Sequence, residues 1–179
     1  MASGSSFSVT HTGLARVLIT YAGISPAFDP HTLERSKWPV AAPFNAIWDT
    51  GATHTVITQA VVDRCHLKPT GMTKVSGVNG EHMSETYFVN IELPNKTGFC
   101  AVKVTKGSFT GGEVLIGMDV ISLGDFAITH RGGKTLFSFQ HPSCASIDFK
   151  AMQATVGPND RCSCSSGKKF KKCCGSFMR

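Results

Sequence analysis

The strongest constraint on the fold is an apolar alternation with a period of two residues. In the run 87–93, the odd-numbered residues are apolar or aromatic, whereas the even-numbered ones include Asn90 and Glu92. The run 100–104 repeats the pattern, which predicts that the Cys100 thiol is buried. Successive side chains of a strand point to opposite faces, so this period is typical of half-buried β-strands. The chain is therefore predicted to be mainly β.

Turn residues separate these runs. Asn79-Gly80 predicts a hairpin with these two residues at its centre, because both central positions of a tight hairpin turn favour positive φ. The segment Arg131–Lys134, with two central glycines, predicts a second hairpin. The 18 glycines and eight prolines are spread among such turns, as expected for a β-rich fold.

Few segments favour a helix. We predict one short helix over Thr58–Leu67, with Thr58 as its cap, and another over Asp119–Leu123 that ends at Gly124. The proline-rich stretch Ser25–Pro43 is predicted to be an irregular loop. Further strands are predicted at 16–21, 46–48, 114–116, 126–128 and 135–139.

The size and charge of the chain favour one main domain with a small appendage. Its 179 residues and 12 phenylalanines suffice for one packed core. The net charge of +6 is uneven, because six basic residues and one acidic residue lie between Asp160 and Arg179. The remaining 12 basic and 11 acidic residues nearly cancel, so the pI of about 9.0 belongs to the tail.

The sequence also indicates a compartment. No apolar run approaches the roughly 20 residues of a membrane helix, and the opening Met1–Thr10 lacks the features of a secretory signal. We therefore expect a cytoplasmic protein without a membrane partner, in which the seven cysteines are thiols or metal ligands. The lysine run 168–172 has only Phe170 as an interleaved aromatic residue, which disfavours a nucleic-acid partner.

The sharpest catalytic signal is Asp49-Thr50-Gly51-Ala52, which directly follows the apolar run 46–48. An aspartic protease holds two carboxylates about 3 Å apart, and they share one proton because both cannot ionise. One acts as general base on a water while the other acts as general acid toward the substrate carbonyl. Of the seven aspartates, only Asp49 precedes a Thr/Ser-Gly pair, so the second carboxylate must come from another copy in a twofold dimer. Taken alone, the triplet also fits an ordinary turn after a strand.

Two further segments favour the catalytic interpretation. The hairpin Val75–Gly80 follows the triplet at a distance suited to a flap, and the apolar run Val114–Ile116 ends in Gly117. In this order, IWDTGA, SGVNG and VLIGMD resemble the retropepsin-like aspartic proteases, over roughly Phe7 to Phe139. The resemblance implies a closed β-barrel that works as a homodimer, with one catalytic aspartate per chain and a flap over an extended polypeptide substrate.

The resemblance also implies a role for each matching residue. The catalytic residues would be Asp49, Thr50 and Gly51, and the substrate-binding residues would be Ala52, Val78, Asn79 and Gly80. Thr50 would lock the active loops of the two copies together, and Ile116 and Gly117 would pack behind the loop. Met118-Asp119 stands where viral members commonly have an arginine. No cofactor is implied for catalysis, and His54 is expected to be a surface or supporting residue.

The tail carries a second constraint, a dense cluster of thiols. Cys162, Cys164, Cys173 and Cys174 match the four thiolates that zinc binds in a tetrahedral structural site. So short a segment has no core of its own, and metal binding would supply its free energy of folding. Gly167 is suited to reverse the chain between the two pairs. Disulfides are the alternative, although a bridge between the adjacent Cys173 and Cys174 would be strained.

The string from Gly157 to Gly175 strongly resembles the SEC-C motif, which is found at the end of the translocation ATPase SecA. The resemblance implies a structural zinc ion held by the four cysteines, and docking onto a protein partner or a ribosome. Many members end in Cys-His where this chain has Cys173-Cys174, and both residue types are zinc ligands.

Together these features predict a retropepsin-like protease domain over 1–150, a linker over 151–156 and a SEC-C zinc knuckle over 157–179. The leading interpretation is an aspartic endopeptidase, a hydrolase whose zinc knuckle docks onto a partner. The alternative is a noncatalytic dimeric adaptor that binds peptides and is recruited through the knuckle. The intact triplet at Asp49 favours the enzyme, because an adaptor does not need that carboxylate.

Overall fold

The chain divides into two compact units by its contacts. The computed structural model describes residues 5–77, 80–151, 157–164 and 166–177. The units are Met1–Cys144 and Ala145–Arg179. None of the described helices is long and apolar enough to cross a membrane. All seven cysteines lie in the described part of the chain, and none of them forms a disulfide.

Strands dominate the first unit, as the sequence predicts. They are β1 Ser5–Thr10, β2 Ile19–Pro26, β3 Ala42–Trp48, β4 Val56–Ile57, β5 Gly71–Gly77, β6 Gly80–Glu92, β7 Gly98–Lys106, β8 Val114–Ile116, β9 Asp125–Thr129 and β10 Leu136–His141. The α-helices are α1 Gln59–Arg64 and α2 Met118–Ile121, and the 3-10 helices are η1 Arg35–Lys37, η2 Arg131–Gly133, η3 Phe170–Lys172 and η4 Cys174–Phe177. The predicted mainly β fold with short helices is confirmed.

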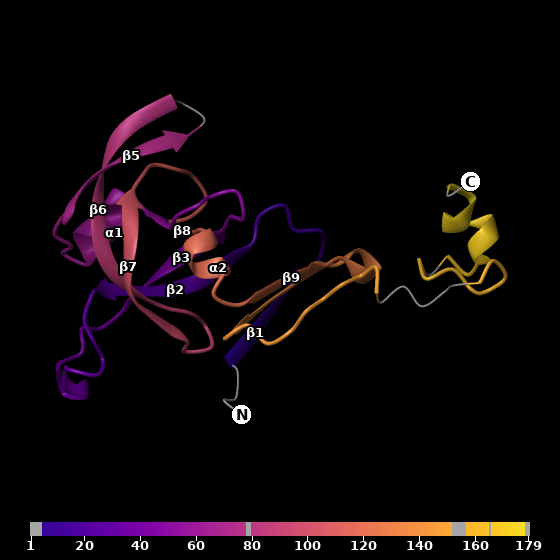
Figure 1. The fold of residues 1–179 in the computed structure, drawn as a ribbon, viewed down its shortest axis with the longest axis horizontal. Coiled ribbons are helices and arrows are strands. Elements are labelled where there is room, and N and C mark those ends of the chain that lie inside the picture. Colours follow the sequence, from indigo (N-terminus) through magenta and orange to yellow (C-terminus); the bar gives the residue numbers. More distant parts are fainter. Residues whose placement is uncertain (1–4, 78–79, 152–156, 165, 178–179) are drawn as a thin grey trace. The chain divides into compact units, whose positions relative to one another are not determined.

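Seven strands form a curled sheet in the order β2-β3-β8-β4-β7-β6-β5. An additional pairing of β2 with β6 brings the sheet round into a barrel. The predicted closure is incomplete, because β4 pairs with β7 and with β8 through only two residues each. The hairpin of β5 and β6 extends beyond this ring and rises from it (Figure 1). We call this hairpin the flap.

A second sheet, in the order β1-β10-β9, packs against the barrel through aromatic rings. The ring of Trp48, the last residue of β3, lies 5.0 Å from the ring of Phe139 and 5.1 Å from that of Phe137. Its Nε1 donates a buried hydrogen bond to Thr20 Oγ1 at 2.9 Å. Strand β3 is therefore anchored at the residue before Asp49. The aromatic cluster comprises Phe7, Trp48, Phe126, Phe137 and Phe139.

The predicted alternation is confirmed on one face of β6 and at Leu93, which directly follows it, and is wrong at one residue of the other face. The apolar or aromatic residues at 87, 89, 91 and 93 are at most 2% exposed. The pattern places Asn90 on the open face, but Asn90 is buried. Its Nδ2 donates to the Phe28 carbonyl at 2.8 Å, and its Oδ1 accepts from the Ala101 amide at 2.8 Å. A buried amide is stable here because backbone groups satisfy it on both sides.

A bulge in β7 makes the prediction for Cys100 wrong. The pairing of β6 with β7 shifts register between Val89 and Ile91, and Ala101 adopts a φ of 52°. A bulge adds one residue to one strand and thereby changes which side chains face inward. Phe99 is consequently buried, whereas the Cys100 thiol is exposed.

Several predicted boundaries shift. Gly77 pairs with Gly80, so Gly80 begins β6 and is not a central residue of the hairpin turn. Helix α1 follows Thr58 as predicted, but the Thr58 side chain makes no capping hydrogen bond and the helix ends at Arg64. The irregular loop is shorter than predicted, because β2 continues to Pro26 and β3 begins at Ala42. The second predicted hairpin is confirmed, since β9 and β10 are antiparallel and η2 joins them.

Candidate active site and metal cluster

The aspartate loop begins where β3 leaves the core. The Asp49 amide donates to the carbonyl of Ile116 at 3.0 Å, which continues the parallel pairing of β3 with β8. The Asp49 side chain then shapes the turn, because its Oδ1 accepts from the Gly51 amide at 2.8 Å. Ala52 closes the turn by donating its amide to the Asp49 carbonyl at 3.2 Å. Asp49 is half-buried and Thr50 is exposed, so the loop presents both to the outside.

Gly117 allows α2 to approach the aspartate loop. A Cβ at this position would lie 2.6 Å from the carbonyl carbon of His54 and 3.0 Å from the Ala52 oxygen. Only glycine leaves room for this contact between two backbones. This close approach allows two hydrogen bonds. The Met118 amide donates to the Ala52 carbonyl at 2.8 Å, and the Asp119 amide donates to the Thr53 carbonyl at 3.2 Å. The glycine after β8 therefore fixes the loop from behind, and we call these two hydrogen bonds from the start of α2 the α2 clamp.

Asp119 is a supporting residue to which the sequence pattern assigned no contact. Its carboxylate accepts from the Thr55 amide at 2.9 Å and from the Thr55 hydroxyl at 2.8 Å. The same hydroxyl accepts from the Gly117 amide at 3.2 Å, and Thr55 is fully buried. Asp119 lies in the first turn of α2, where a carboxylate is favourable. The only signal for Asp119 in the sequence was that Met118-Asp119 stands where viral members of the retropepsin-like proteases commonly have an arginine.

Two cavities flank the aspartate loop. One, of about 390 Å³, lies between the segment 15–18, Asp49, Thr50 and β9. The other, of about 420 Å³, is lined by residues 51–54 and 56 of the loop and β4, by residues 73–76 of the flap strand β5, and by Lys103 and Thr105 of β7. We call the second one the flap cavity. The loop thus has one face toward the flap and another toward the three-stranded sheet.

The structure brings most of the predicted protease residues together. Asp49, Thr50, Gly51 and Ala52 form one loop between the two cavities. Gly80 lies in the flap, at the start of β6, and is exposed. The predicted flap-tip residues Val78 and Asn79 lie outside the described residues. His54 is exposed and lines the flap cavity. Asp49 is not among the described residues that line this cavity, so the structure does not mark His54 as its catalytic partner.

The four predicted metal ligands form one cluster in the second unit. The Sγ atoms of Cys162, Cys164, Cys173 and Cys174 all lie within 4.8 Å of one another. With metal–sulfur bonds of about 2.3 Å, the sulfur–sulfur edges of a tetrahedron are about 3.8 Å, so metal binding needs only small adjustments of these positions. Cys162 is buried, and the Cys164 and Cys173 sulfurs are 3.3 Å apart. The cluster is able to hold one metal ion.

Hydrogen bonding already favours a thiolate in this cluster. Bonds from the Ser166 hydroxyl and from the Cys162 thiol lower the pKa of Cys164 to about 6. Its neighbour Cys174 is affected in the opposite direction, because its hydrogen bond to Cys162 raises its pKa to about 12. Thiols bind metals in their deprotonated form, so a bound cation would favour ionisation of all four.

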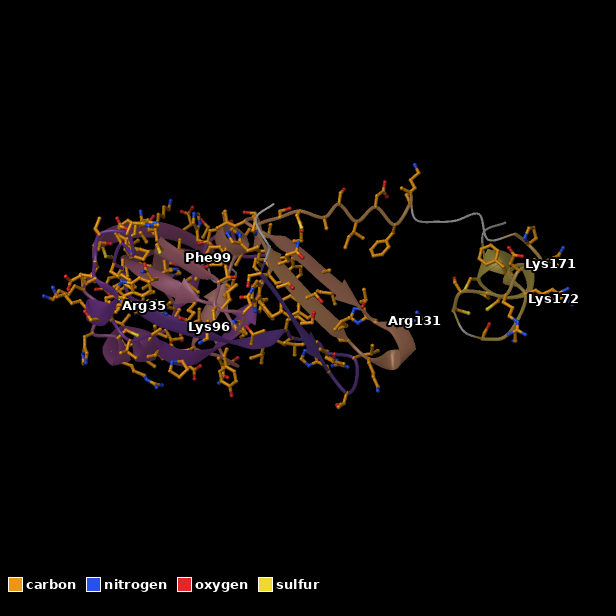
Figure 2. All side chains as sticks on the ribbon, turned by 90° about the horizontal axis from the view of Figure 1, so that it is seen from below. Arg35, Lys96, Phe99, Arg131, Lys171 and Lys172 are labelled. Atoms are coloured by element: carbon orange, nitrogen blue, oxygen red, sulfur yellow. The ribbon has the colours of Figure 1, made fainter. Side chains whose placement is uncertain are left out.

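Short backbone bridges hold the cysteines in place. The Cys162 amide donates to the Lys168 carbonyl at 2.8 Å, and Gly167 reverses the chain with a φ of 72°, as predicted. Gly175 lies against Phe170, because a Cβ on Gly175 would approach that ring to 2.8 Å. Phe170 is consequently half-buried. Lys171 and Lys172 extend outward from this unit (Figure 2).

Comparison with known proteins supports both parts. Residues 41–122 match the family described as gag-polyprotein putative aspartyl protease, and residues 159–176 match the SEC-C motif. The crystal structure of a retropepsin-like aspartic protease from Rickettsia conorii superposes with a TM-score of 0.50 at 12% identity, over 78% of this chain and 97% of that one. The barrel has the retropepsin-like fold. Both resemblances predicted from the sequence are therefore confirmed.

Two further similarities cover a smaller part of this chain. The EIAV protease complexed with the inhibitor HBY-793 aligns with the retropepsin-like barrel at a TM-score of 0.44 and 19% identity, over 61% of this chain and 88% of that one. The protein translocase subunit SecA of Desulforapulum autotrophicum is 49% identical over 46 residues, which cover 26% of this chain and 6% of SecA. This chain therefore spans only a small fraction of that relative's length.

Proposed function

We propose that the protein is an aspartic endopeptidase that acts as a homodimer, with one Asp49 from each copy. The observation that carries the proposal is the aspartate loop itself, which lies between two cavities. The half-buried Asp49 carboxylate accepts from the Gly51 amide, the Asp49 backbone amide donates to the Ile116 carbonyl, and the α2 clamp holds the end of the loop. An ordinary turn after a strand would not require these supporting contacts, so they favour a functional loop. Gly117 and Asp119 reach this loop from a segment more than 60 residues later in the chain.

The chemistry follows from the pairing of two such loops. The two carboxylates share one proton, because two like charges at close range cannot both be present. The ionised one takes a proton from a water as the water oxygen attacks the scissile carbonyl carbon, and the protonated one donates its proton to the carbonyl oxygen. Collapse of the tetrahedral intermediate breaks the carbon–nitrogen bond, and the amine leaves with a proton returned from the dyad.

The exposed side of the loop is suited to a second copy. Thr50 is exposed next to Asp49, and the cavity that both line is open to solvent in the single chain. A twofold axis beside the loop would bring the two Thr50 residues together and place the two Asp49 carboxylates side by side. The substrate backbone would then run along Gly51 and Ala52, beneath the flaps that contain Gly80 and the residues Val78 and Asn79.

For the second unit, we propose a structural zinc ion on the four cysteines and a docking role. Zinc prefers a closed set of four thiolates, which is the donor set of this cluster. The basic residues of the knuckle favour an acidic face on a protein or ribosome partner, and SecA shares this motif. The absence of a disulfide among the seven cysteines, all of which are described, agrees with a cytoplasmic location. We retain 1–150 and 157–179 as the functional domains, joined by 151–156.

The test is cleavage of an unstructured polypeptide at mildly acidic pH by the wild-type protein and by Asp49→Asn. Asparagine keeps the shape of the side chain but cannot share the proton, so activity should disappear while the fold remains. Specific activity of the wild type should also fall on dilution toward the dimer dissociation constant. Equal cleavage by both proteins would refute the mechanism. Peptide binding without cleavage by either protein would favour the noncatalytic adaptor.

A further inference from the structure

The flap cavity has an unusual charge for a site that holds part of a peptide. Its charged side chains are Lys74 and Lys103, and His54 adds a third nitrogen base. Among the described residues that line it, there is no aspartate or glutamate. The rest of the lining is threonine, serine and small aliphatic residues. A cavity of this composition attracts negative charge and repels positive charge.

The two lysines are not equivalent. Lys74 forms an ion pair with Glu81 across the flap hairpin, so much of its charge is compensated. Lys103 makes no ion pair with any described residue, and its side chain is exposed on β7 opposite Phe88. Lys103 is therefore the principal uncompensated charge of the flap cavity. His54, which we expected to be a surface or supporting residue, lies on the loop side of the same cavity.

The cavity also adjoins the place where cleavage would occur. Gly51 and Ala52, which continue the aspartate loop, form part of its wall. In an extended peptide, alternate side chains point to the same side. A substrate lying along Gly51 and Ala52 would therefore direct one side chain close to the scissile bond into the flap cavity. Val56 and Val75 offer apolar contact for its methylene groups, and Lys103 offers a partner for its end.

We propose that the flap cavity selects an acidic side chain of the substrate, with Lys103 as the specificity-determining residue. This inference rests on the proposed function and adds a substrate class to it. The volume of about 420 Å³ accommodates a glutamate side chain with some water. Lys103 is exposed, so the preference is moderate and depends on salt, as for other solvent-accessible ion pairs.

The experiment uses full-length protein and sets of peptides that differ at a single position near the scissile bond. Each set carries Glu, Gln or Lys at that position, and the position is moved one residue at a time on both sides of the bond. At one position we expect kcat/KM for Glu to exceed that for Gln by about fivefold at low salt, and to approach it at about 1 M salt. Competition between two peptides in one sample makes this ratio independent of the active enzyme concentration.

Charge reversal at Lys103 supplies the decisive variant. Lys103→Glu should invert the order, so that the Lys peptide becomes the better substrate at that position. Lys68→Glu is the matched control, because it changes the net charge equally at an exposed residue that lies outside the flap cavity. The control should keep the wild-type preference. Lys103→Gln, which introduces no new charge, should abolish the preference for Glu over Gln if the reversed variant folds poorly.

The outcomes separate this inference from the proposed function. If no peptide or unstructured polypeptide is cut, or if Asp49→Asn cuts them equally well, the proposed function fails and the inference fails with it. If the wild type cuts peptides but Glu and Gln are equivalent at every position, the endopeptidase stands and the selection of acidic residues is wrong. A preference for Glu that survives Lys103→Gln would also overturn the role of Lys103.

Discussion

The aspartate loop and the cysteine cluster are both compact sites, but they are held together by different means. The loop is fixed by backbone hydrogen bonds to β8 and α2 and by the absence of a side chain at Gly117. Trp48 anchors its entry in a core of aromatic rings. The cysteine cluster has four sulfurs, a few local backbone bonds and one half-buried ring, that of Phe170.

This difference decides what each site needs in order to form. The loop draws on contacts between segments far apart in sequence, so it is complete once the barrel has folded. The cluster draws almost wholly on residues within one short segment, which buries too little apolar surface to offset the loss of chain entropy. In the proposed zinc knuckle, the metal ion supplies the difference. The comparison therefore predicts that the two sites respond to different perturbations.

The largest expected effect is the loss of structure in the knuckle when metal is removed. We expect one zinc ion per chain, and metal binding to thiolate sites contributes on the order of 10 kcal/mol. A strong chelator should therefore abolish the hydrogen-exchange protection of residues 157–177 and leave the melting transition of the barrel unchanged. Elemental analysis and hydrogen exchange on the same full-length sample check both parts.

Cysteine variants sharpen this test. Cys173→Ser removes one ligand and should reproduce the effect of the chelator, whereas Cys144→Ser, at a thiol outside the cluster, should retain zinc. If chelation lowers the melting temperature of the barrel, then the two units are not independent in stability and the comparison is wrong.

The second effect concerns the loop and should be insensitive to metal. In Gly117→Ala, the new Cβ meets the backbone of His54 and Ala52, which cannot move without breaking the α2 clamp. We expect a loss of about 3 kcal/mol in the free energy of unfolding, because overpacking against a rigid backbone has costs of this size. Peptide cleavage should fall more steeply than stability alone explains, since the clamp sets the position of Asp49.

The control is Gly13→Ala, because a Cβ at Gly13 has no atom within 4 Å. Its stability should stay within about 0.5 kcal/mol of the wild type. Urea unfolding of both variants, measured with and without chelator, gives the comparison directly. A Gly117→Ala protein as stable and as active as Gly13→Ala would show that the clamp does not position the loop.

The sequence predicts the parts of this molecule that a repeated local pattern encodes. A buried strand face requires apolar side chains at every second position, so the core residues of β6 could be predicted. The aspartate loop and the cysteines could also be predicted, because each is a contiguous motif with its own chemistry. Their placement as site residues is still a prediction that the proposed experiments address.

What could not be predicted depends on contacts between distant segments or on one local irregularity. Asp119 and Thr55 are 64 residues apart, and no local pattern around either residue predicts their contact. The bulge at Ala101 exposes Cys100, and it is stabilised by Asn90 from the neighbouring strand. The alternation of apolar and polar residues does not predict a buried amide such as Asn90. Both failures concern polar groups that satisfy backbone atoms, which hydrophobic periodicity does not describe.

The last and smallest effect tests whether the barrel core is complete without the knuckle. Tyr87 is 2% exposed, and burial together with the hydrogen bond that its hydroxyl donates to Glu85 raises its pKa to about 12. The chain has two tyrosines, so the Tyr21→Phe variant leaves Tyr87 as the only one that absorbs as a tyrosinate. Its titration should have a midpoint near pH 12, with or without zinc.

The sign of the linked stability change follows from this pKa. The unfolded chain loses the tyrosine proton near pH 10, whereas the folded chain keeps it until about pH 12. The contribution of Tyr87 is therefore full below pH 10 and is lost as the pH rises to about 12, by about 2 kcal/mol. Tyr87→Phe should lack this part of the alkaline decline. Glu85→Gln should keep most of the shift, because burial is its largest cause. A Tyr87 midpoint near pH 10, or one that moves when zinc is removed, would mean that the core around Tyr87 is open to water or depends on the knuckle.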